Sequence, residues 1–280
     1  GSIVTNYHVV ENANSITVTP YDGTTYDATM VGYDEDNDLA VLKIDATGLT
    51  PVVIGDSSNM NVGDPVVAIG NPLGELTFSL TSGSISALHR NITLEDNITM
   101  ELIQTDCAIN SGNSGGALFN MYGEVIGITN AKYSSSTSSG ASIDNIAFAI
   151  PISDVKDTID GIIEDGTVRS GYIGVSVVDG TSVNLSSGAV VASVTENGPA
   201  EQAGLQINDC ITAVNGEAIS GSSDLRRIIR NAEIGSTLNL TVTRGTQTLE
   251  LQVTVEEQVT DALEGIQNTN ESTNNRSFFN

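Results

Sequence analysis

Short, mostly hydrophobic segments typical of β-strands follow one another through the first half of the chain. Polar turn residues, among them Asp-Gly, Asn-Pro and Gly-Asp pairs, separate them. This spacing is typical of short antiparallel strands in a barrel or sandwich. The strands predicted in this way are Ile16–Thr19, Ala28–Tyr33, Leu39–Ile44, Pro65–Ile69, Thr81–Leu88, Ala117–Phe119, Glu124–Thr129 and Ala147–Ile150.

A change of period marks the end of this β-rich half. After Ser153, which is the candidate N-cap, apolar residues such as Val155 and Ile159 recur at helical spacing. Gly166 is the candidate residue that ends the helix. A single helix that closes a β domain gives a natural boundary, and we therefore predict a first domain over residues 1–166.

A second unit, of α+β type, is predicted over residues 167–257. Its segments are strands at Tyr172–Val178, Ala189–Val194 and Cys210–Val214, a helix over Ser223–Ala232, and a hairpin of Thr237–Thr243 with Thr248–Val255. The helix carries one apolar stripe at positions i, i+3, i+4 and i+7, which is typical of a helix packed on a core.

Both ends of the chain differ from the middle. Residues 258–280 are rich in Asn, Thr, Ser and Glu, which predicts a disordered polar tail. The chain opens inside a strand-like run, Gly1–Thr5, and we expect that an N-terminal portion with an export signal or membrane anchor is missing. The sequence contains no apolar run near the ~18 residues of a membrane-spanning helix.

The charge and the cysteine content exclude several classes of function. The formal net charge is -25, from 35 acidic and 10 basic residues. Nucleic acid binding needs clustered Lys and Arg, so we expect no nucleic-acid partner. Cys107 and Cys210 fall in different predicted domains, and neither belongs to a Cys/His cluster. We therefore expect no disulfide, no metal site and no cofactor.

The strongest chemical motif is GNSGG at Gly112–Gly116, with Ser114 at its centre. A serine hydroxyl becomes a nucleophile when a base takes its proton and donors stabilise the oxyanion. Glycines on both sides let the backbone turn sharply and direct N–H groups at the carbonyl under attack. Taken alone, the motif also fits a plain turn in a chain rich in Gly and Ser.

Two further segments supply a base and a partner for that base. His8 follows a strand-like run, and Asp38 begins another, with the sequence DLAVLK. The order His, Asp, Ser along the chain is that of the chymotrypsin type, unlike the orders in subtilisin or the α/β-hydrolases. The other histidine, His89, lacks such neighbours, and we interpret it as a surface residue.

These motifs stand in a longer series of blocks that resembles the HtrA/Deg family of trypsin-like serine proteases. In the first domain the blocks are TNYHVV from Thr5, DLAVLK from Asp38, GNP from Gly70, TDCAIN from Thr105, GNSGGAL from Gly112 and IAFAIP from Ile146. The second domain resembles the PDZ domain of that family, in the blocks GYIGV from Gly171, GPAEQAGL from Gly198 and INDCITAVNG from Ile207.

The resemblance implies a mainly β fold, with a chymotrypsin-like double β-barrel that lacks early strands, followed by an α+β PDZ domain. It implies a catalytic triad of His8 as general base, Asp38 as the residue that orients its imidazole, and Ser114 as nucleophile. The N–H groups of Gly112 and Ser114 would form the oxyanion hole, and the Asn113 peptide would set the conformation of this loop.

Substrate preference follows from the residues expected in the specificity pocket. Ala108 stands six positions before Ser114, where trypsin carries an acidic residue, and Ile109 follows it. An apolar pocket offers no partner for Lys or Arg, and an unpaired buried charge is strongly unfavourable. We therefore predict cleavage after small or medium aliphatic residues.

The PDZ domain predicts a second binding site. A peptide C-terminus is a carboxylate, which consecutive backbone N–H groups can bind while the peptide adds to a sheet edge as a strand. The residues predicted to supply the loop and edge strand are Tyr172, Ile173, Gly174 and Val175, and those predicted to line the groove are Leu225, Ile228 and Ile229. The alternative is that this helix stripe belongs to the ordinary core.

The sequence therefore predicts a serine endopeptidase that hydrolyses unfolded or misfolded polypeptides outside the cytoplasm, in the cell envelope or after secretion. Its PDZ domain would bind peptide C-termini and regulate activity, and the resemblance implies a homotrimer for the full-length protein. Two alternatives stay open: a catalytically silent peptide-binding scaffold or chaperone, and a secreted protease with one extracellular target. The intact triad and glycine loop favour the enzyme.

Overall fold

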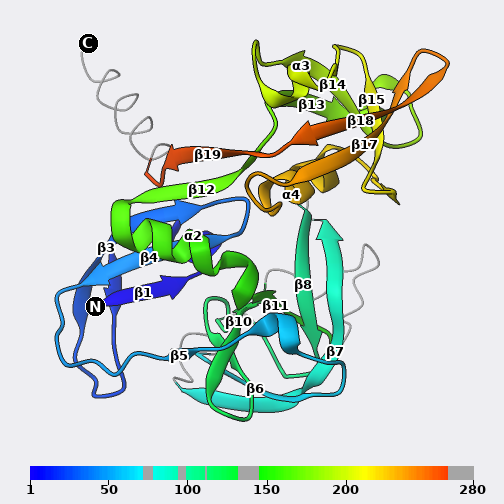
Figure 1. Ribbon diagram of the computed structural model, residues 1–280. Helices are drawn as coiled ribbons and strands as arrows, with labels where there is room; N and C mark the ends of the chain where they lie inside the picture. Colours follow the sequence, from blue (N-terminus) through cyan, green and yellow to red (C-terminus); the bar gives the residue numbers. More distant parts are fainter. Residues whose placement is uncertain (72–77, 94–98, 111, 132–144, 264–280) are drawn as a thin grey trace, which may run out of the picture. The chain divides into compact units, whose positions relative to one another are not determined.

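The computed structural model describes residues 1–71, 78–93, 99–110, 112–131 and 145–263 (Figure 1). Most of residues 1–168, together with residues 260–263, form one compact unit, and residues 169–259 form a second. This division falls close to the boundary predicted after residue 166. Strands predominate in both units, so the prediction of a mainly β fold is confirmed.

The first unit contains an open antiparallel sheet. Its strands, in spatial order, are β1 (Ser2–Thr5), β4 (Leu39–Ile44), β3 (Tyr26–Asp34) and β2 (Ile16–Val18). Strand β4 is buried along almost its whole length, and helix α2 (Ile152–Asp165) lies against β3 and β4. A strand buried on both faces has a continuous apolar sequence, which is why LAVLKI predicted the bounds of β4.

A second sheet in the same unit closes into a barrel. The ring runs β11, β8, β7, β6, β9, β10, and β10 pairs with β11 to complete it. The bounds are β6 (Pro65–Gly70), β7 (Ser79–Thr93), β8 (Thr99–Thr105), β9 (Ala117–Phe119), β10 (Glu124–Asn130) and β11 (Ala147–Pro151), and β5 (Val53–Ile54) joins β10 in parallel. Aliphatic side chains such as Val66, Ile103 and Leu118 form its core.

Helix α2 ends as predicted but begins differently. Gly166 takes the left-handed C-cap conformation, with φ 71°. Pro151 occupies the N-cap position, so the prediction that Ser153 caps the helix is wrong. The Ser153 N–H instead donates to Ser57 Oγ at 3.1 Å, in the 3-10 turn η1 (Ser57–Asn59). The cap comes from a residue far away in sequence, which a local pattern does not reveal.

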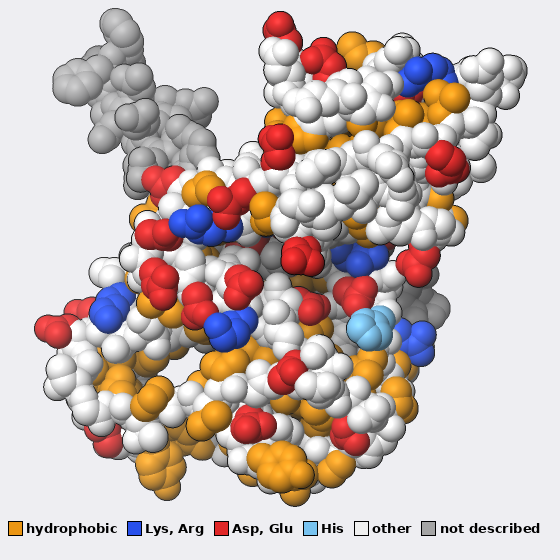
Figure 2. All heavy atoms as spheres, in the orientation of Figure 1, with side chains coloured by type: hydrophobic (Ala, Val, Ile, Leu, Met, Phe, Trp, Pro, Cys, Tyr) orange, Lys and Arg blue, Asp and Glu red, His pale blue; other side chains and the backbone are white. Residues whose placement is uncertain are grey.

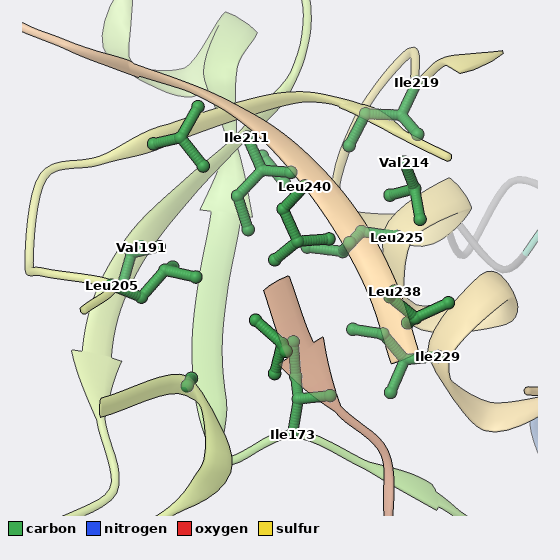
Figure 3. Close-up of a cluster of buried hydrophobic side chains, with 14 of the residues drawn as sticks. Ile173, Val191, Leu205, Ile211, Val214, Ile219, Leu225, Ile229, Leu238 and Leu240 are labelled. Carbon is green, nitrogen blue, oxygen red and sulfur yellow. The ribbon is translucent and has the colours of Figure 1, made fainter. Parts of the chain in front are cut away.

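The second unit is a sheet with helices packed against it. The strand order from one edge of the sheet to the other is β13 (Val175–Asp179), β14 (Ala189–Val194), β15 (Cys210–Val214), β17 (Thr237–Arg244) and β18 (Gln247–Thr254). Strand β16 (Glu217–Ala218) pairs with β15. The helical elements are η4 (Gly180–Val183), α3 (Pro199–Gln202) and α4 (Ser222–Arg230). Aliphatic side chains from the sheet and from α4 form the core (Figure 3).

The predicted strand Tyr172–Val178 is divided in two. Strand β12 (Thr167–Tyr172) pairs with β19 (Glu256–Asp261), and β13 begins only at Val175. Between them Gly174 has φ 78°, a conformation that favours glycine. The chain therefore turns between the two strands at the block GYIGV.

The prediction of a disordered tail from residue 258 is wrong for residues 258–263. Strand β19 runs to Asp261, and Ala262 is only 2% exposed. The Ala262 N–H donates to the Gly166 carbonyl at 2.9 Å, and the Ala262 carbonyl accepts from the Tyr33 N–H at 3.0 Å. The composition of the segment does not reveal these tertiary bonds. Residues 264–280 lie outside the described residues.

Acidic side chains are spread over the face shown in Figure 2. This agrees with the formal net charge of -25. Charge of one sign in this amount favours solubility and repels polyanions. Within the described ranges, no helix is long and apolar enough to cross a membrane.

Candidate active site

Two of the three predicted catalytic residues are in direct contact. His8 lies on the one-turn helix α1 (Tyr7–Val10) after β1, and Asp38 lies in the turn between β3 and β4. His8 Nδ1 is 2.7 Å from Asp38 Oδ2, and the His8 backbone N–H donates to Asp38 Oδ1 at 2.9 Å. The carboxylate therefore fixes the ring and the backbone of the histidine and favours the tautomer with a proton on Nδ1.

Two buried asparagines hold Asp38, and the sequence analysis missed both. Asn130, at the end of β10, donates from Nδ2 to Asp38 Oδ2 at 2.7 Å. Asn6 donates from Nδ2 to the Asp38 carbonyl at 3.0 Å. Asp38 is itself buried and has φ 49°. Asn130 compensates for the loss of water around the carboxylate, and Asn6 holds the backbone of Asp38 in its left-handed conformation.

The loop that carries Ser114 is fastened to β10. The Gly115 N–H donates to the Thr129 carbonyl at 3.0 Å, and the Thr129 N–H donates to the Gly116 carbonyl at 2.9 Å. Gly115 has φ 80°, and a Cβ at this position would lie 2.0 Å from Thr5 Oγ1 on β1. Both the backbone conformation and the closeness of β1 therefore require glycine after the nucleophile.

The backbone donors predicted for the oxyanion hole have no acceptor among the described residues. The N–H groups of Gly112 and Ser114 donate no hydrogen bond there, whereas the Asn113 N–H donates to the Asn110 carbonyl at 2.9 Å. Gly112 has φ 94°, which a residue with a side chain rarely adopts. Unpaired donors on both sides of Asn113 are available for a developing negative charge.

The hydroxyl of Ser114 is bound to the backbone of β10. Ser114 Oγ accepts a hydrogen bond from the Ala131 N–H at 3.0 Å, and among the described residues it makes none with His8. Ala131 directly follows Asn130, so consecutive residues contact Ser114 and Asp38. The three predicted catalytic residues are therefore gathered around the end of β10.

The two predicted pocket residues differ in accessibility. Ala108 is exposed, and its carbonyl accepts hydrogen bonds from Thr81 Oγ1 at 3.2 Å and from Asn113 Nδ2 at 3.4 Å. Ile109 is buried in the core of the closed barrel. The prediction that Ile109 lines the pocket is therefore wrong, because its side chain packs inward, whereas Ala108 stays a candidate.

The predicted carboxylate-binding loop lies at the open edge of the second unit's sheet. The carbonyls of Ile173 and Gly174 accept from the N–H groups of Ala200 at 2.9 Å and Thr195 at 2.8 Å. Among the described residues the N–H groups of Ile173 and Gly174 donate no hydrogen bond. Val175 begins the edge strand β13. Free donors beside a free strand edge suit the carboxylate of an extended peptide.

The predicted groove residues on α4 are mostly core residues. Figure 3 shows the side chains of Leu225 and Ile229 directed into the hydrophobic cluster, together with Ile173. Leu225 is fully buried and Ile229 almost so, whereas Ile228 is partly exposed. The burial of Leu225 and Ile229 contradicts their assignment to the groove wall, and Ile228 remains the candidate.

The remaining reactive side chains lie away from this chemistry. Cys107 and Cys210 are both buried free thiols, and burial raises the pKa of each. A thiol in such surroundings is a poor nucleophile. The side chain of His89 is 79% exposed and pairs with Glu101, which agrees with its interpretation as a surface residue.

Comparison with known proteins identifies the same two domains in the same order. Residues 1–128 match the trypsin-like peptidase domain, and residues 171–255 match the PDZ domain. The serine protease Do-like HtrB of Bacillus subtilis (strain 168) is 39% identical over 276 residues, which cover 91% of this chain and 59% of that protein.

Two further relatives extend the comparison. A protein of Brucella suis biovar 1 (strain 1330), named probable periplasmic serine endoprotease DegP-like, is 44% identical over 264 residues, 91% of this chain and 50% of that protein. The chain thus spans between half and three fifths of the length of these curated relatives. The solved structure of the HtrA-type protease AlgW with a decapeptide is 37% identical, with a TM-score of 0.68, over 92% of this chain and 80% of that one. The chain belongs to the HtrA/Deg family of serine proteases, with a trypsin-like peptidase domain followed by a PDZ domain.

Proposed function

We propose that this chain is a serine endopeptidase in which His8, Asp38 and Ser114 form the catalytic triad. The observation that carries the proposal is the hydrogen bond between His8 Nδ1 and Asp38 Oδ2, which leaves Nε2 as the basic nitrogen of the ring. His8 Nε2 takes the Ser114 proton while Oγ attacks the peptide carbonyl, and later protonates the leaving amine. The Asp38 carboxylate stabilises the imidazolium that forms between these steps.

The hydrogen bonding of Ser114 makes the structure a resting state in this proposal. Attack requires the Ser114 hydroxyl to donate to His8 Nε2, a bond that is absent among the described residues, whereas the Ala131 N–H uses only an acceptor position of Oγ. The oxyanion of the tetrahedral intermediate would then accept hydrogen bonds from the Gly112 and Ser114 N–H groups. Loss of one such donor costs ~10²–10³ in rate, so the conformation of this loop would control activity.

Two features support the proposed substrates. The exposed Ala108 carries no charge that could pair with Lys or Arg, which favours small or medium aliphatic residues before the cleaved bond. Relatives named as periplasmic serine endoproteases support a location outside the cytoplasm, and unfolded or misfolded polypeptides are the substrates proposed there. A peptide library read by mass spectrometry tests the preference, and dominant cleavage after Arg or Lys would contradict this pocket.

The PDZ domain is the proposed regulatory site. Its free N–H groups at Ile173 and Gly174 would bind the carboxylate of a peptide C-terminus, while the peptide pairs with β13 from Val175 onward. Tyr172 borders the loop through a hydrogen bond between its hydroxyl and Thr195 Oγ1, 3.0 Å apart. A homotrimer is proposed for the full-length protein from the family alone, and analytical ultracentrifugation would test it.

An active-serine probe tests the catalytic proposal directly. A fluorophosphonate should label the wild-type protein at Ser114, and casein should be hydrolysed, because His8 can activate the hydroxyl. Ser114→Ala should abolish both signals, and Asp38→Asn should lower kcat by about 10⁴-fold because it changes the tautomer of His8.

The second candidate is a catalytically silent peptide-binding scaffold. The observation that favours it is that Ser114 Oγ accepts from the Ala131 N–H and, among the described residues, makes no hydrogen bond with His8. A scaffold would bind C-terminal peptides with the same affinity in wild type and Ser114→Ala, and neither would be labelled or hydrolyse casein. Labelling of the wild type alone excludes this candidate.

A further inference from the structure

Two stacked tyrosines lie beside the proposed catalytic pair. The ring centroids of Tyr7 and Tyr33 are 4.4 Å apart and the ring planes differ by 11°. Tyr7 directly precedes His8 on α1, and Tyr33 lies near the end of β3, the strand that leads into the turn with Asp38. Both rings pack on a small buried cluster that includes Val10. The stack therefore connects the backbone segments that carry the base and its carboxylate.

Helix α1 is too short to position His8 by itself. It is four residues long, and its N-cap residue Asn6 makes no side-chain capping bond. Helices of this length are not stable by themselves. The Tyr7 N–H donates to the Asp38 carbonyl at 3.1 Å, and the Tyr7 ring is held by Tyr33. Burial, Tyr33 and nearby acids raise the pKa of Tyr7 to about 12, so Tyr7 stays uncharged at neutral pH.

Tyr33 is in turn held by the segment that follows the PDZ domain. The Tyr33 N–H donates to the Ala262 carbonyl at 3.0 Å, and Ala262 is bound through its own N–H to Gly166. Gly32 leaves the space that Ala262 fills, because a Cβ on Gly32 would lie 2.4 Å from the Ala262 Cβ and 2.8 Å from Ile162 Cγ2. The end of β3 is therefore fixed from one side by Ala262 and from the other by the ring of Tyr7.

We propose that Tyr7 and Tyr33 are positioning residues for His8 and Asp38, and that the segment around Ala262 holds Tyr33 in the orientation this requires. Neither tyrosine touches the reacting atoms. Their effect is to keep α1 against the Asp38 turn, so that the His8 ring stays within hydrogen-bond distance of the carboxylate. The activity part of this proposal rests on the proposed function, whereas the geometric part does not.

Steady-state kinetics with a short chromogenic peptide test the role of the stack. Tyr33→Leu keeps an apolar side chain but removes the ring, and we expect kcat to fall by about 10- to 100-fold, since small displacements of a catalytic group have effects of this size. KM should stay within about twofold, because the tyrosines do not contact substrate. Tyr33→Phe restores the ring and should bring kcat back to within about threefold of wild type.

NMR of the His8 imidazole tests the geometry of His8 and Asp38 without any need for enzymatic activity. The chain has two histidines, so protein labelled with ¹⁵N-histidine gives few imidazole signals, and His89→Gln assigns the one from His8. The His8 Nδ1–H, hydrogen-bonded to Asp38, should give a slowly exchanging downfield signal in wild type and Tyr33→Phe. That signal should be lost in Tyr33→Leu, while the far-UV spectrum stays that of a folded protein.

The role of the Ala262 segment is tested by a double-mutant cycle. Ala262→Asp buries a charge against Gly32 and should lower kcat about as much as Tyr33→Leu, and the double variant should lose little more than either single one. Val259→Asp, on β19 three residues before Ala262 but 49% exposed, is the control and should keep wild-type kcat.

The outcomes separate the two proposals. A folded Tyr33→Leu protein with wild-type kcat and an unchanged His8 signal overturns the positioning role. Additive losses in the cycle, or no effect of Ala262→Asp, overturn the role of the segment. A wild-type protein without any hydrolysis overturns the proposed function, and the response of the His8 signal to Tyr33→Leu and Ala262→Asp then decides the positioning role alone.

Discussion

Asn130 and Asp38 share a buried hydrogen bond, in which Asn130 Nδ2 donates to Asp38 Oδ2 over 2.7 Å. The same carboxylate oxygen lies 2.7 Å from His8 Nδ1. Asn130 ends β10 in the closed barrel, and Asp38 precedes β4 in the open sheet. This bond therefore ties the sheet that bears the proposed base to the sheet that bears the Ser114 loop.

Asn130→Ala should lower both activity and stability. The Asp38 carboxylate would lose a donor inside the protein, which costs about 1–3 kcal/mol in the free energy of unfolding. Asp38 would no longer be held in the orientation in which it binds the His8 ring. We therefore expect kcat to fall by about tenfold or more, with little change in KM. Urea unfolding and peptide kinetics measure the two effects.

Asn59→Ala is the matched control for that substitution. Asn59 is an exposed asparagine whose Nδ2 donates to Asp56 Oδ2 at 2.6 Å. Its loss should change the free energy of unfolding by less than about 0.5 kcal/mol and leave kcat unchanged. Equal effects of the two variants on kcat would show that Asn130 has no specific role.

Gly115→Ala should abolish labelling by an active-serine probe. A Cβ at Gly115 would lie 2.0 Å from Thr5 Oγ1, so the loop that carries Ser114 would have to move. Gly123→Ala is the control, because its φ of 79° nearly equals the 80° of Gly115 while nothing lies within 4 Å of its Cβ. The backbone strain, about 1–2 kcal/mol, is shared by both variants, and only the clash differs. Normal labelling of Gly115→Ala would show that the clash is not decisive.

The parts of the fold that the sequence predicted have local causes. Strand β4 has a continuous apolar sequence, and α2 ends at a glycine in the conformation that glycine favours. Strand β8 has no such signal, because Glu101 and Gln104 interrupt its apolar residues and the barrel supplies its burial. The order of residues 258–263 likewise depends on tertiary hydrogen bonds made by Ala262.

Some residues of the candidate site were likewise predicted from the sequence, whereas others have a role that only the tertiary structure reveals. His8, Asp38 and Ser114 were predicted because the reaction demands those residue types and because their order along the chain is that of the chymotrypsin type. Asn130 is an ordinary polar residue in the sequence, and only the pairing of the two sheets gives it a role. For Leu225 the sequence pattern is ambiguous, because its position in the apolar stripe of the helix fits either a groove residue or a core residue. Only the packing in the structure shows that Leu225 belongs to the core.

The ion pair of Asp209 and Arg244 predicts a pH dependence for the stability of the PDZ domain. Arg244 Nε and Nη2 each lie 2.7 Å from a carboxylate oxygen of Asp209. Burial on its own raises the pKa of Asp209, but the hydrogen bonds from Arg244 and the Gln206 N–H outweigh it and hold the pKa below its ordinary value. A lowered carboxyl pKa stabilises the fold above the unfolded pKa of about 3.9, and this contribution is lost as the pH falls through the folded pKa.

Arg244→Leu should therefore destabilise the protein by about 3 kcal/mol at pH 7, since it leaves a buried carboxylate unpaired. The difference from wild type should shrink below about pH 4, as Asp209 takes up a proton. Urea unfolding followed by far-UV circular dichroism at several pH values measures this. Arg169→Leu is the control, because its pair with Glu257 is exposed at 3.4 Å and should contribute less than about 1 kcal/mol. A difference for Arg244→Leu that stays constant from pH 7 to pH 3 would contradict this account.

Leu225 and Ile228 should respond to truncation in different ways. Leu225 is fully buried, so Leu225→Ala should cost about 2–5 kcal/mol in the free energy of unfolding. Ile228 is partly exposed but packs against the same core, so Ile228→Ala should cost less stability than Leu225→Ala while it weakens binding of a peptide with an apolar C-terminal residue by about 5- to 30-fold. Fluorescence anisotropy measures the affinity, with the amidated peptide as a control that removes the carboxylate. Wild-type affinity in Ile228→Ala would remove the last candidate on α4 from the groove and leave the backbone loop at Gly174 as the whole of the predicted site.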